Sequence, residues 1–90
     1  MPAAQPISKT LLAAARNGDV AAQNEIILVL TPLLVRISSR YFIIGGDTED
    51  LIQEGMIGLF DAVNSYDSGR EASFATFAGM CIKRQMYSAV

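Results

Sequence analysis

The sequence predicts an all-α fold, a compact bundle of three long helices and one short helix. Three observations carry this prediction: apolar residues recur at three- and four-residue spacing, capping residues precede these segments, and no segment alternates apolar and polar residues with a period of two. The chain has 90 residues, of which 51% are hydrophobic, so it can bury one small core. We find no internal repeat and no low-complexity tract.

Two capping signals divide the start of the chain into a short helix and a long one. Ser8 and Asp19 are good N-cap residues, and Asn17-Gly18 is a good helix stop. We therefore expect a short helix over about 8–16 and a second helix from Asp19 onward. Residues 1–7 are expected to form a flexible N-terminus.

The second helix carries one apolar stripe and an internal proline. Because Pro32 lacks an N–H and crowds the preceding turn, it should kink or split the helix near Thr31. Gly45-Gly46 should end the segment. The stripe consists of Ile26, Ile27, Leu30, Leu33, Leu34, Ile37 and Tyr41.

A third helix is predicted from about Asp47 to Ser65, with either Asp47 or Thr48 as its cap. Its apolar half consists of Leu51, Ile52, Met56, Leu59, Phe60, Ala62 and Val63. Its polar half consists of Asp50, Gln53, Glu54, Asp61 and Asn64, with Ile57 alone in the middle. Gly55 and Gly58 weaken the helix, so the backbone there should either meet a close neighbour, leave a bare surface or pack loosely in the core.

A fourth helix should begin after a turn over 66–71, with Ser73 as its cap, and continue to the last residue. Its core face consists of Phe74, Ala78, Cys81, Ile82, Met86 and Ala89. The opposite face consists of Thr76, Phe77, Met80, Lys83, Arg84 and Tyr87. Two aromatic rings and a methionine thus stand among two bases and a hydroxyl.

Charge is distributed unevenly along the chain, although the formal net charge is only −2. The segment 47–71 contains seven acids and one base, Arg70. Residues 72–90 contain Lys83 and Arg84 and no acid. An acidic stretch is therefore followed by a small basic end.

The composition excludes most catalytic chemistry. The chain has no histidine and one cysteine, which removes the usual zinc sites, histidine bases, serine triads and disulfides. We therefore expect no enzyme activity, no metal site and no cofactor, and Cys81 is expected to be a packing residue. The N-terminus lacks the pattern of a secretory signal, and charges interrupt the apolar segments. A cytoplasmic location and no membrane partner follow as expectations.

The exposed faces of the last two helices each allow two interpretations. The acidic face with Ile57 is either an ordinary solvated surface or a docking surface, in which Ile57 is an apolar anchor, Gln53 and Glu54 form a polar rim, and the bare glycines allow close contact. On the fourth helix, rings beside cations suit unpaired nucleic acid bases, which stack on aromatic side chains while phosphates meet Lys and Arg. Alternatively, Phe77 and Met80 pack under another helix and Tyr87 lies at an edge.

Two sequence motifs in the second half of the chain resemble those of a known protein family. The run DLIQEGMIGLFDAV over 50–63, followed by SFATFA over 73–78, resembles the second conserved region of bacterial RNA polymerase sigma factors. ARNGDVAAQNEII and RYF, earlier in the chain, are similar to the start of that region in the sporulation-type sigma-H group. The resemblance covers nearly the whole chain from Leu11 and implies an all-α domain over 8–90, truncated before a further DNA-binding domain.

The resemblance implies a role for each exposed face. The third helix would dock on the clamp helices of the largest catalytic subunit of core RNA polymerase, through Asp50, Gln53, Glu54 and Ile57. The fourth helix would open promoter DNA and read the single-stranded non-template strand of the minus-ten element. The residues implied for DNA binding are Phe74, Thr76, Phe77, Met80, Lys83, Arg84 and Tyr87.

The chain also departs from the family pattern. Met80 and Cys81 occupy the positions where primary sigma factors carry a Trp pair, and Ala72 replaces a Tyr. Fewer rings imply weaker strand capture, as in alternative sigma factors. The resemblance puts Phe74 in the pocket for a flipped base, whereas the helical pattern puts it on the core face.

The resemblance implies a transcription initiation factor domain that recognises and melts the minus-ten element. An anti-sigma factor is a further possible partner. The alternative, which the low positive charge and the missing Trp pair favour, is a protein-interaction module. Such a module would be a decoy or regulator that binds polymerase or an anti-sigma partner without reading DNA.

Overall fold

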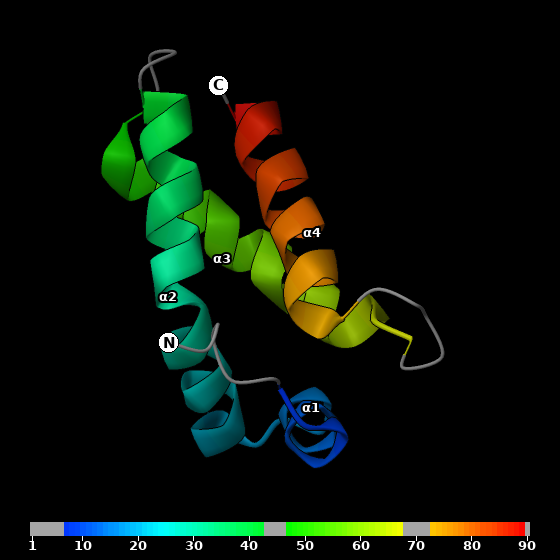
Figure 1. The fold of residues 1–90 in the computed structure, drawn as a ribbon. Coiled ribbons are helices and arrows are strands. Elements are labelled where there is room, and N and C mark those ends of the chain that lie inside the picture. The colour runs from blue at the N-terminus through cyan, green and yellow to red at the C-terminus, as the bar shows by residue number, and fades with distance from the viewer. Residues whose placement is uncertain (1–6, 43–46, 68–72, 90) are drawn as a thin grey trace, which may run out of the picture.

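The computed structural model describes residues 7–42, 47–67 and 73–89. This described part contains four helices and no strand: α1 (Lys9–Arg16), α2 (Val20–Phe42), α3 (Thr48–Ser65) and α4 (Phe74–Ala89). In Figure 1, α2 and α4 lie side by side, α3 crosses behind them, and α1 lies at the lower end of the bundle. The predicted all-α bundle of three long helices and one short helix is confirmed.

The link between α1 and α2 follows the predicted capping signals. The Asp19 N–H donates to the Ala14 carbonyl at 3.0 Å and the Gly18 N–H to the Ala15 carbonyl at 3.1 Å, which is a Schellman ending. Gly18 has a φ of +92°, a left-handed conformation that glycine adopts without steric cost. The Asp19 carboxylate then accepts hydrogen bonds from the N–H groups of Ala21 and Ala22, so it caps α2.

The other helix starts also agree with the sequence. The Ser8 hydroxyl accepts from the Leu11 N–H at 3.0 Å, and the Asp47 carboxylate accepts from the Glu49 N–H at 2.9 Å. The Ser73 hydroxyl accepts from the Thr76 N–H at 3.2 Å. The predicted Gly45-Gly46 stop lies outside the described residues, as does most of the predicted turn over 66–71. Residues 1–6 of the predicted flexible N-terminus also lie outside them, whereas Ile7 is half-buried against the core.

One hydrophobic core joins all four helices. α3 and α4 make the most extensive packing of any helix pair, and α2 packs on both of them. The apolar stripes predicted for α2 and α4 face this core, except that the side chain of Ala89 lies outside the described part, and Cys81 is buried as expected. The largest fully buried side chains are those of Ile26, Leu30, Ser38, Leu51, Leu59, Ile82 and Met86. Burial of apolar area of this kind is the dominant favourable contribution to folding.

Pro32 does not split α2. The helix continues from Val20 to Phe42, so of the two predicted effects, a kink or a split near Thr31, the split is absent. The kink stays a prediction. Pro32 is exposed, and the carbonyl that loses its helical donor belongs to Leu28, which is also exposed. The Thr31 hydroxyl donates to the neighbouring Ile27 carbonyl at 2.7 Å. Because the missing hydrogen bond falls on the solvent side, water can replace it and the helix persists.

Gly58 marks the closest approach of two helix backbones. A Cβ atom at this position would lie 2.7 Å from the Cys81 carbonyl oxygen and 2.9 Å from the Ile82 Cα atom. At Gly55 a Cβ would instead meet side chains of the core, including Leu34 at 2.8 Å. Both glycines are buried. The first of the three interpretations, close backbone approach, is therefore correct, and the glycines are not part of an exposed docking surface.

α2 is more apolar than the sequence analysis allowed. By length and composition, residues 20–41 could cross a membrane, with a mean hydropathy of 1.5 over the most apolar window. The expectation that charges exclude such a segment is therefore wrong. In the fold, one face of this helix builds the core, and Leu28 and Val35 on the opposite face are exposed. Two apolar faces explain the high hydropathy of this helix.

Candidate functional site: two exposed helix faces

The first candidate face is the outer side of α3. Asp50, Gln53, Glu54 and Ile57 are spaced i, i+3, i+4 and i+7, so they form one surface stripe. Asp50 and Gln53 are exposed, and the side chain of Ile57 is 50% exposed. The structure thus brings together all four residues that the resemblance implied for docking. Their role in binding stays a prediction.

Glu54 is held in place from within the molecule. The Gln85 side-chain amide donates to the Glu54 carboxylate at 2.7 Å, which links α4 to α3. Glu54 is half-buried, so this hydrogen bond is shielded from water more than a surface contact is. Gln85 therefore orients one of the predicted docking side chains. Sequence analysis missed it because the two residues lie 31 positions apart.

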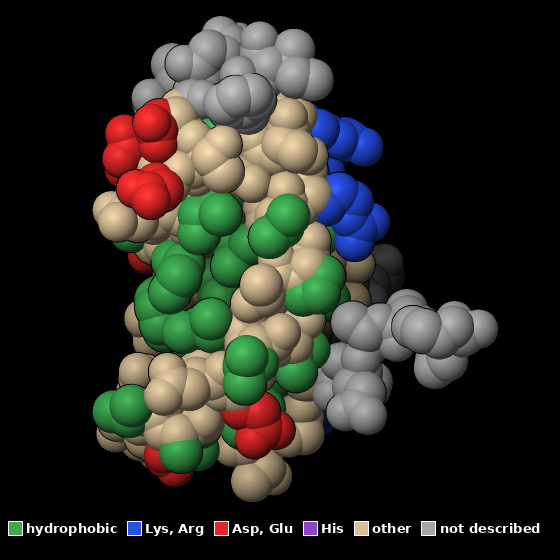
Figure 2. Space-filling view, turned by 90° about the vertical axis from the view of Figure 1, so that its left-hand side faces the viewer, with side chains coloured by type: hydrophobic (Ala, Val, Ile, Leu, Met, Phe, Trp, Pro, Cys, Tyr) green, Lys and Arg blue, Asp and Glu red, His purple; other side chains and the backbone are tan. Residues whose placement is uncertain are grey.

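An apolar flank borders the docking stripe. Ile52, Met56 and Phe60 belong to the apolar half predicted for α3, and the structure leaves them half-buried. Met56 packs against the core. Around the helix, Gln53 lies between Met56 and Ile57. Figure 2 shows hydrophobic side chains across the middle of one face of the molecule, with acidic side chains at its upper left and at its lower end and Lys and Arg at its upper right. An apolar centre with a polar rim is typical of a protein interface.

The second candidate face is the outer side of α4. Met80 is 63% exposed and Tyr87 is 70% exposed, and Lys83 and Arg84 lie in solvent beside them. The Tyr87 ring contacts Tyr41 of α2 edge to face, with ring centroids 6.2 Å apart. The face therefore offers apolar and aromatic surface next to two cations, as the sequence predicted.

The N-terminal part of this face is more enclosed. Phe77 is half-buried, and its ring centroid lies 5.5 Å from that of Tyr66. Phe74 is only 4% exposed and lies 5.4 Å from the same tyrosine ring. The helical pattern therefore placed Phe74 correctly on the core face. The contact with a flipped base that the resemblance implies for it stays a prediction. Tyr66, which sequence analysis did not single out, joins the two phenylalanines.

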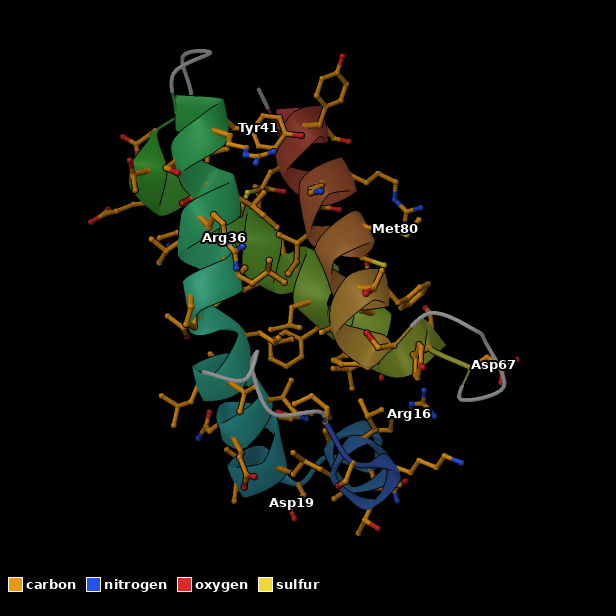
Figure 3. All side chains as sticks on the ribbon, viewed as in Figure 1. Arg16, Asp19, Arg36, Tyr41, Asp67 and Met80 are labelled. Atoms are coloured by element: carbon orange, nitrogen blue, oxygen red, sulfur yellow. The ribbon has the colours of Figure 1, made fainter. Side chains whose placement is uncertain are left out.

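A groove runs between α2 and α4 beside this face. It has a volume of about 400 Å³, and its walls include Thr76, Met80 and Lys83 from α4 and Leu33, Pro32 and Arg36 from α2. Figure 3 labels Arg36 on α2 and Met80 on α4. Arg36 adds a third cation near the predicted DNA-binding residues, which periodicity within α4 alone did not indicate.

The described residues offer no arrangement for metal chemistry. In 7–42, 47–67 and 73–89, no three His, Cys, Asp or Glu side chains gather closely enough to hold an ion. The two exposed faces differ in chemistry: α3 presents an acidic and apolar face, and α4 presents an aromatic and basic one. The described residues thus form a small all-α domain with two distinct exposed faces.

Comparison with known families identifies the family of this helical domain. Residues 26–90 match the family model of sigma-70 region 2, which is most of the chain. The chain therefore belongs to the sigma-70 region 2 family, and the resemblance stated from the motifs is confirmed. The match includes both candidate faces and begins within α2.

Three relatives show how far the similarity extends. The chain is 46% identical over 57 residues to RNA polymerase sigma-H factor of Bacillus subtilis, covering 62% of this chain and 26% of that protein. It is 35% identical over 86 residues to RNA polymerase sigma-28 factor of Bacillus thuringiensis subsp. kurstaki, covering 91% and 36%. It is 40% identical over 74 residues to RNA polymerase sigma factor FliA of Pseudomonas aeruginosa, covering 77% and 29%. The matched part is thus about a quarter to a third of each relative's length.

Proposed function

We propose that this chain is the part of a transcription initiation factor that docks on core RNA polymerase and recognises and melts the promoter minus-ten element. The observation that carries the proposal is that the acidic face of α3 and the aromatic-basic face of α4 are both exposed and lie on different helices. One partner can therefore occupy α3 while another occupies α4. This role is binding without catalysis, performed in the cytoplasm where the polymerase works.

Docking is assigned to α3. Ile57 is half-exposed and lies beside Gln53, so it can act as an apolar anchor with a hydrogen-bonding neighbour. Anchors that a partner buries in this way carry most of the energy of an interface. The carboxylates of Asp50 and Glu54 favour a partner with Arg or Lys, such as the clamp helices of the largest catalytic subunit. An anti-sigma factor that occupied the same stripe would compete with the polymerase.

DNA reading is assigned to α4. With Lys83, Arg84 and Arg36 as the nearby cations, attraction to phosphates alone would give weak binding. Stacking of unpaired bases on aromatic rings contributes about 1–3 kcal/mol per base. Two rings, those of Phe77 and Tyr87, can therefore favour the single-stranded state of a few bases. This offsets the few kcal/mol that unstacking each base costs, and Phe74 supports the site from the core.

The proposal is tested by removing the rings of α4 one at a time. In a complex of the chain with bacterial core polymerase, Phe77→Ala and Tyr87→Ala should each weaken binding of a single-stranded promoter oligonucleotide by about tenfold, the loss expected for one stacked base. Fluorescence anisotropy of the labelled strand measures the affinity. Tyr87→Ala is the cleaner variant, because this ring is mostly exposed and its removal leaves the core intact.

Leu28→Ala is the matched control, because it also removes an exposed apolar side chain but from α2. It should leave strand affinity within about twofold, as expected of a surface substitution away from the site. If both ring variants bound the strand as well as the Leu28 variant, DNA reading would not belong to α4. Polymerase binding without strand binding would instead favour the interaction module that acts as a decoy.

A further inference from the structure

Arg16, the last residue of α1, makes a two-pronged contact with the end of α3. Its Nε–H donates to the Val63 carbonyl at 2.5 Å, and a terminal guanidinium N–H donates to the Tyr66 carbonyl. Tyr66 is the C-cap residue of α3. Figure 3 shows the Arg16 side chain extending from α1 toward this end of α3. The contact joins residues that are 47 and 50 positions apart in the chain.

The chemistry of this contact suits an arginine. The last four carbonyl groups of a helix have no partner within the helix and carry partial negative charge. A guanidinium is a rigid fork of donors, so it can bridge two such carbonyls while its charge is attracted to them. A lysine retains the charge but lacks the fork. Arg16 therefore restrains the position of the Tyr66 backbone and also provides a hydrogen-bond donor for its carbonyl oxygen.

Tyr66 passes this restraint to the aromatic residues of α4. Its ring lies 5.4 Å from the ring of Phe74 and 5.5 Å from that of Phe77, measured between centroids. Phe74 is anchored in the core, but Phe77 is half-buried at the surface. Because the Tyr66 ring is attached to the backbone that Arg16 contacts, a shift of this backbone would move the ring relative to Phe77. The Tyr66 residue thus connects the Arg16 contact to Phe77, through its backbone on one side and its ring on the other.

We propose that Arg16 is a positioning residue for base recognition: by holding the Val63 and Tyr66 carbonyls it fixes the Tyr66 ring, which fixes the orientation of Phe77. This inference rests on the proposed function, in which Phe77 stacks on an unpaired base. It gives α1, which bears none of the predicted site residues, a part in DNA reading. It also requires that loss of Arg16 affect DNA binding without affecting polymerase docking.

The experiment compares Arg16→Gln, Arg16→Lys and Lys9→Gln in the complex with bacterial core polymerase. The probe is a fluorescein-labelled, adenine/thymine-rich single strand of about 12 nucleotides, within the usual site size for such proteins. Arg16→Gln should weaken strand binding by up to about tenfold, because an effect that acts through Phe77 cannot exceed the loss expected for Phe77→Ala. Arg16→Lys should fall between wild type and Arg16→Gln. Lys9→Gln, which removes one exposed charge from the same helix, should match wild type.

A double-mutant cycle with Phe77→Ala distinguishes positioning from general loss of structure. If Arg16 acts through Phe77, adding Arg16→Gln to Phe77→Ala should change strand affinity by less than about twofold, because the two effects are coupled. Polymerase affinity, measured on the same variants, should stay at the wild-type value. Hydrogen exchange of the amides near Tyr66 should become faster in Arg16→Gln, as local opening at the helix end requires.

Three results would overturn the inference. The first is equal strand binding by Arg16→Gln and Lys9→Gln while Phe77→Ala binds weakly, in which case base stacking stands and only the positioning role fails. The second is an equal loss of strand and polymerase binding in Arg16→Gln, with no rescue by lysine, which would make Arg16 a stability residue. The third is normal strand binding by Phe77→Ala, which would remove the proposed role of Phe77 and this inference with it.

Discussion

Replacing Gly58 with alanine is expected to lower the free energy of unfolding by about 2 kcal/mol. The added Cβ would lie 2.7 Å from the Cys81 carbonyl oxygen and 3.0 Å from its carbonyl carbon, and both are backbone atoms that cannot rotate away. Alanine favours a helix over glycine by up to about 1 kcal/mol, so the steric cost must exceed this gain. Urea denaturation followed by circular dichroism measures the difference.

Gly79→Ala is the matched control, because it makes the same change inside α4. A Cβ there would meet only a methyl group of Leu33, at 3.7 Å, which is an ordinary contact. We expect this variant to be as stable as wild type or more stable by up to about 1 kcal/mol. Opposite signs for the two glycines would confirm the close crossing of α3 and α4. A Gly58→Ala variant as stable as Gly79→Ala would show that the helices lie farther apart.

Replacing Gln53 and Glu54 together with alanine is expected to weaken binding of core RNA polymerase by about 3 kcal/mol, or roughly a hundredfold in Kd. The two side chains lie next to the half-exposed Ile57 on the outer face of α3, where a partner would cover them. Truncation then removes contacts and leaves polar groups of the partner unpaired, which is why the expected loss is large. Titration of labelled chain with core polymerase gives the affinity.

Two controls make this result specific. Asn24→Ala with Glu25→Ala removes an adjacent amide and carboxylate from an exposed part of α2, so it matches the chemistry and charge of the change. Gln85→Ala releases Glu54 from its hydrogen bond without removing the carboxylate. We expect the first control to bind normally and the second to lose a smaller part of the affinity. Equal losses at 24–25 and 53–54 would mean that only net charge matters and would contradict docking through α3.

Much of the fold could be predicted from local signals. The structure begins its helices at the predicted caps, which are Ser8, Asp19, Asp47 and Ser73. A side-chain acceptor at the start of a helix satisfies N–H groups that have no partner within the helix. The outer faces of α3 and α4 could also be predicted, because residues three and four positions apart lie on the same side of a helix. Phe74 was placed in the core by periodicity alone, and the structure agrees.

Features that depend on a distant partner could not be predicted. The need for glycine at position 58 arises from the backbone of α4, and the links from Arg16 to Tyr66 and from Gln85 to Glu54 join helices far apart in the sequence. The tolerance of Pro32 depends on which side of α2 faces solvent. Sequence periodicity describes one helix at a time, so it identifies faces but not the pairs that meet across them.

The most direct test of the central claim is a selection from a pool of random single-stranded DNA by core RNA polymerase, with and without this chain. The account predicts that strands sharing a short motif are enriched only when the chain is bound, and that enrichment disappears with Tyr87→Ala while polymerase binding remains. If the chain bound the polymerase but the same unbiased pool were recovered with and without it, the chain would dock without reading DNA. The assignment of α4 to promoter recognition would then be wrong.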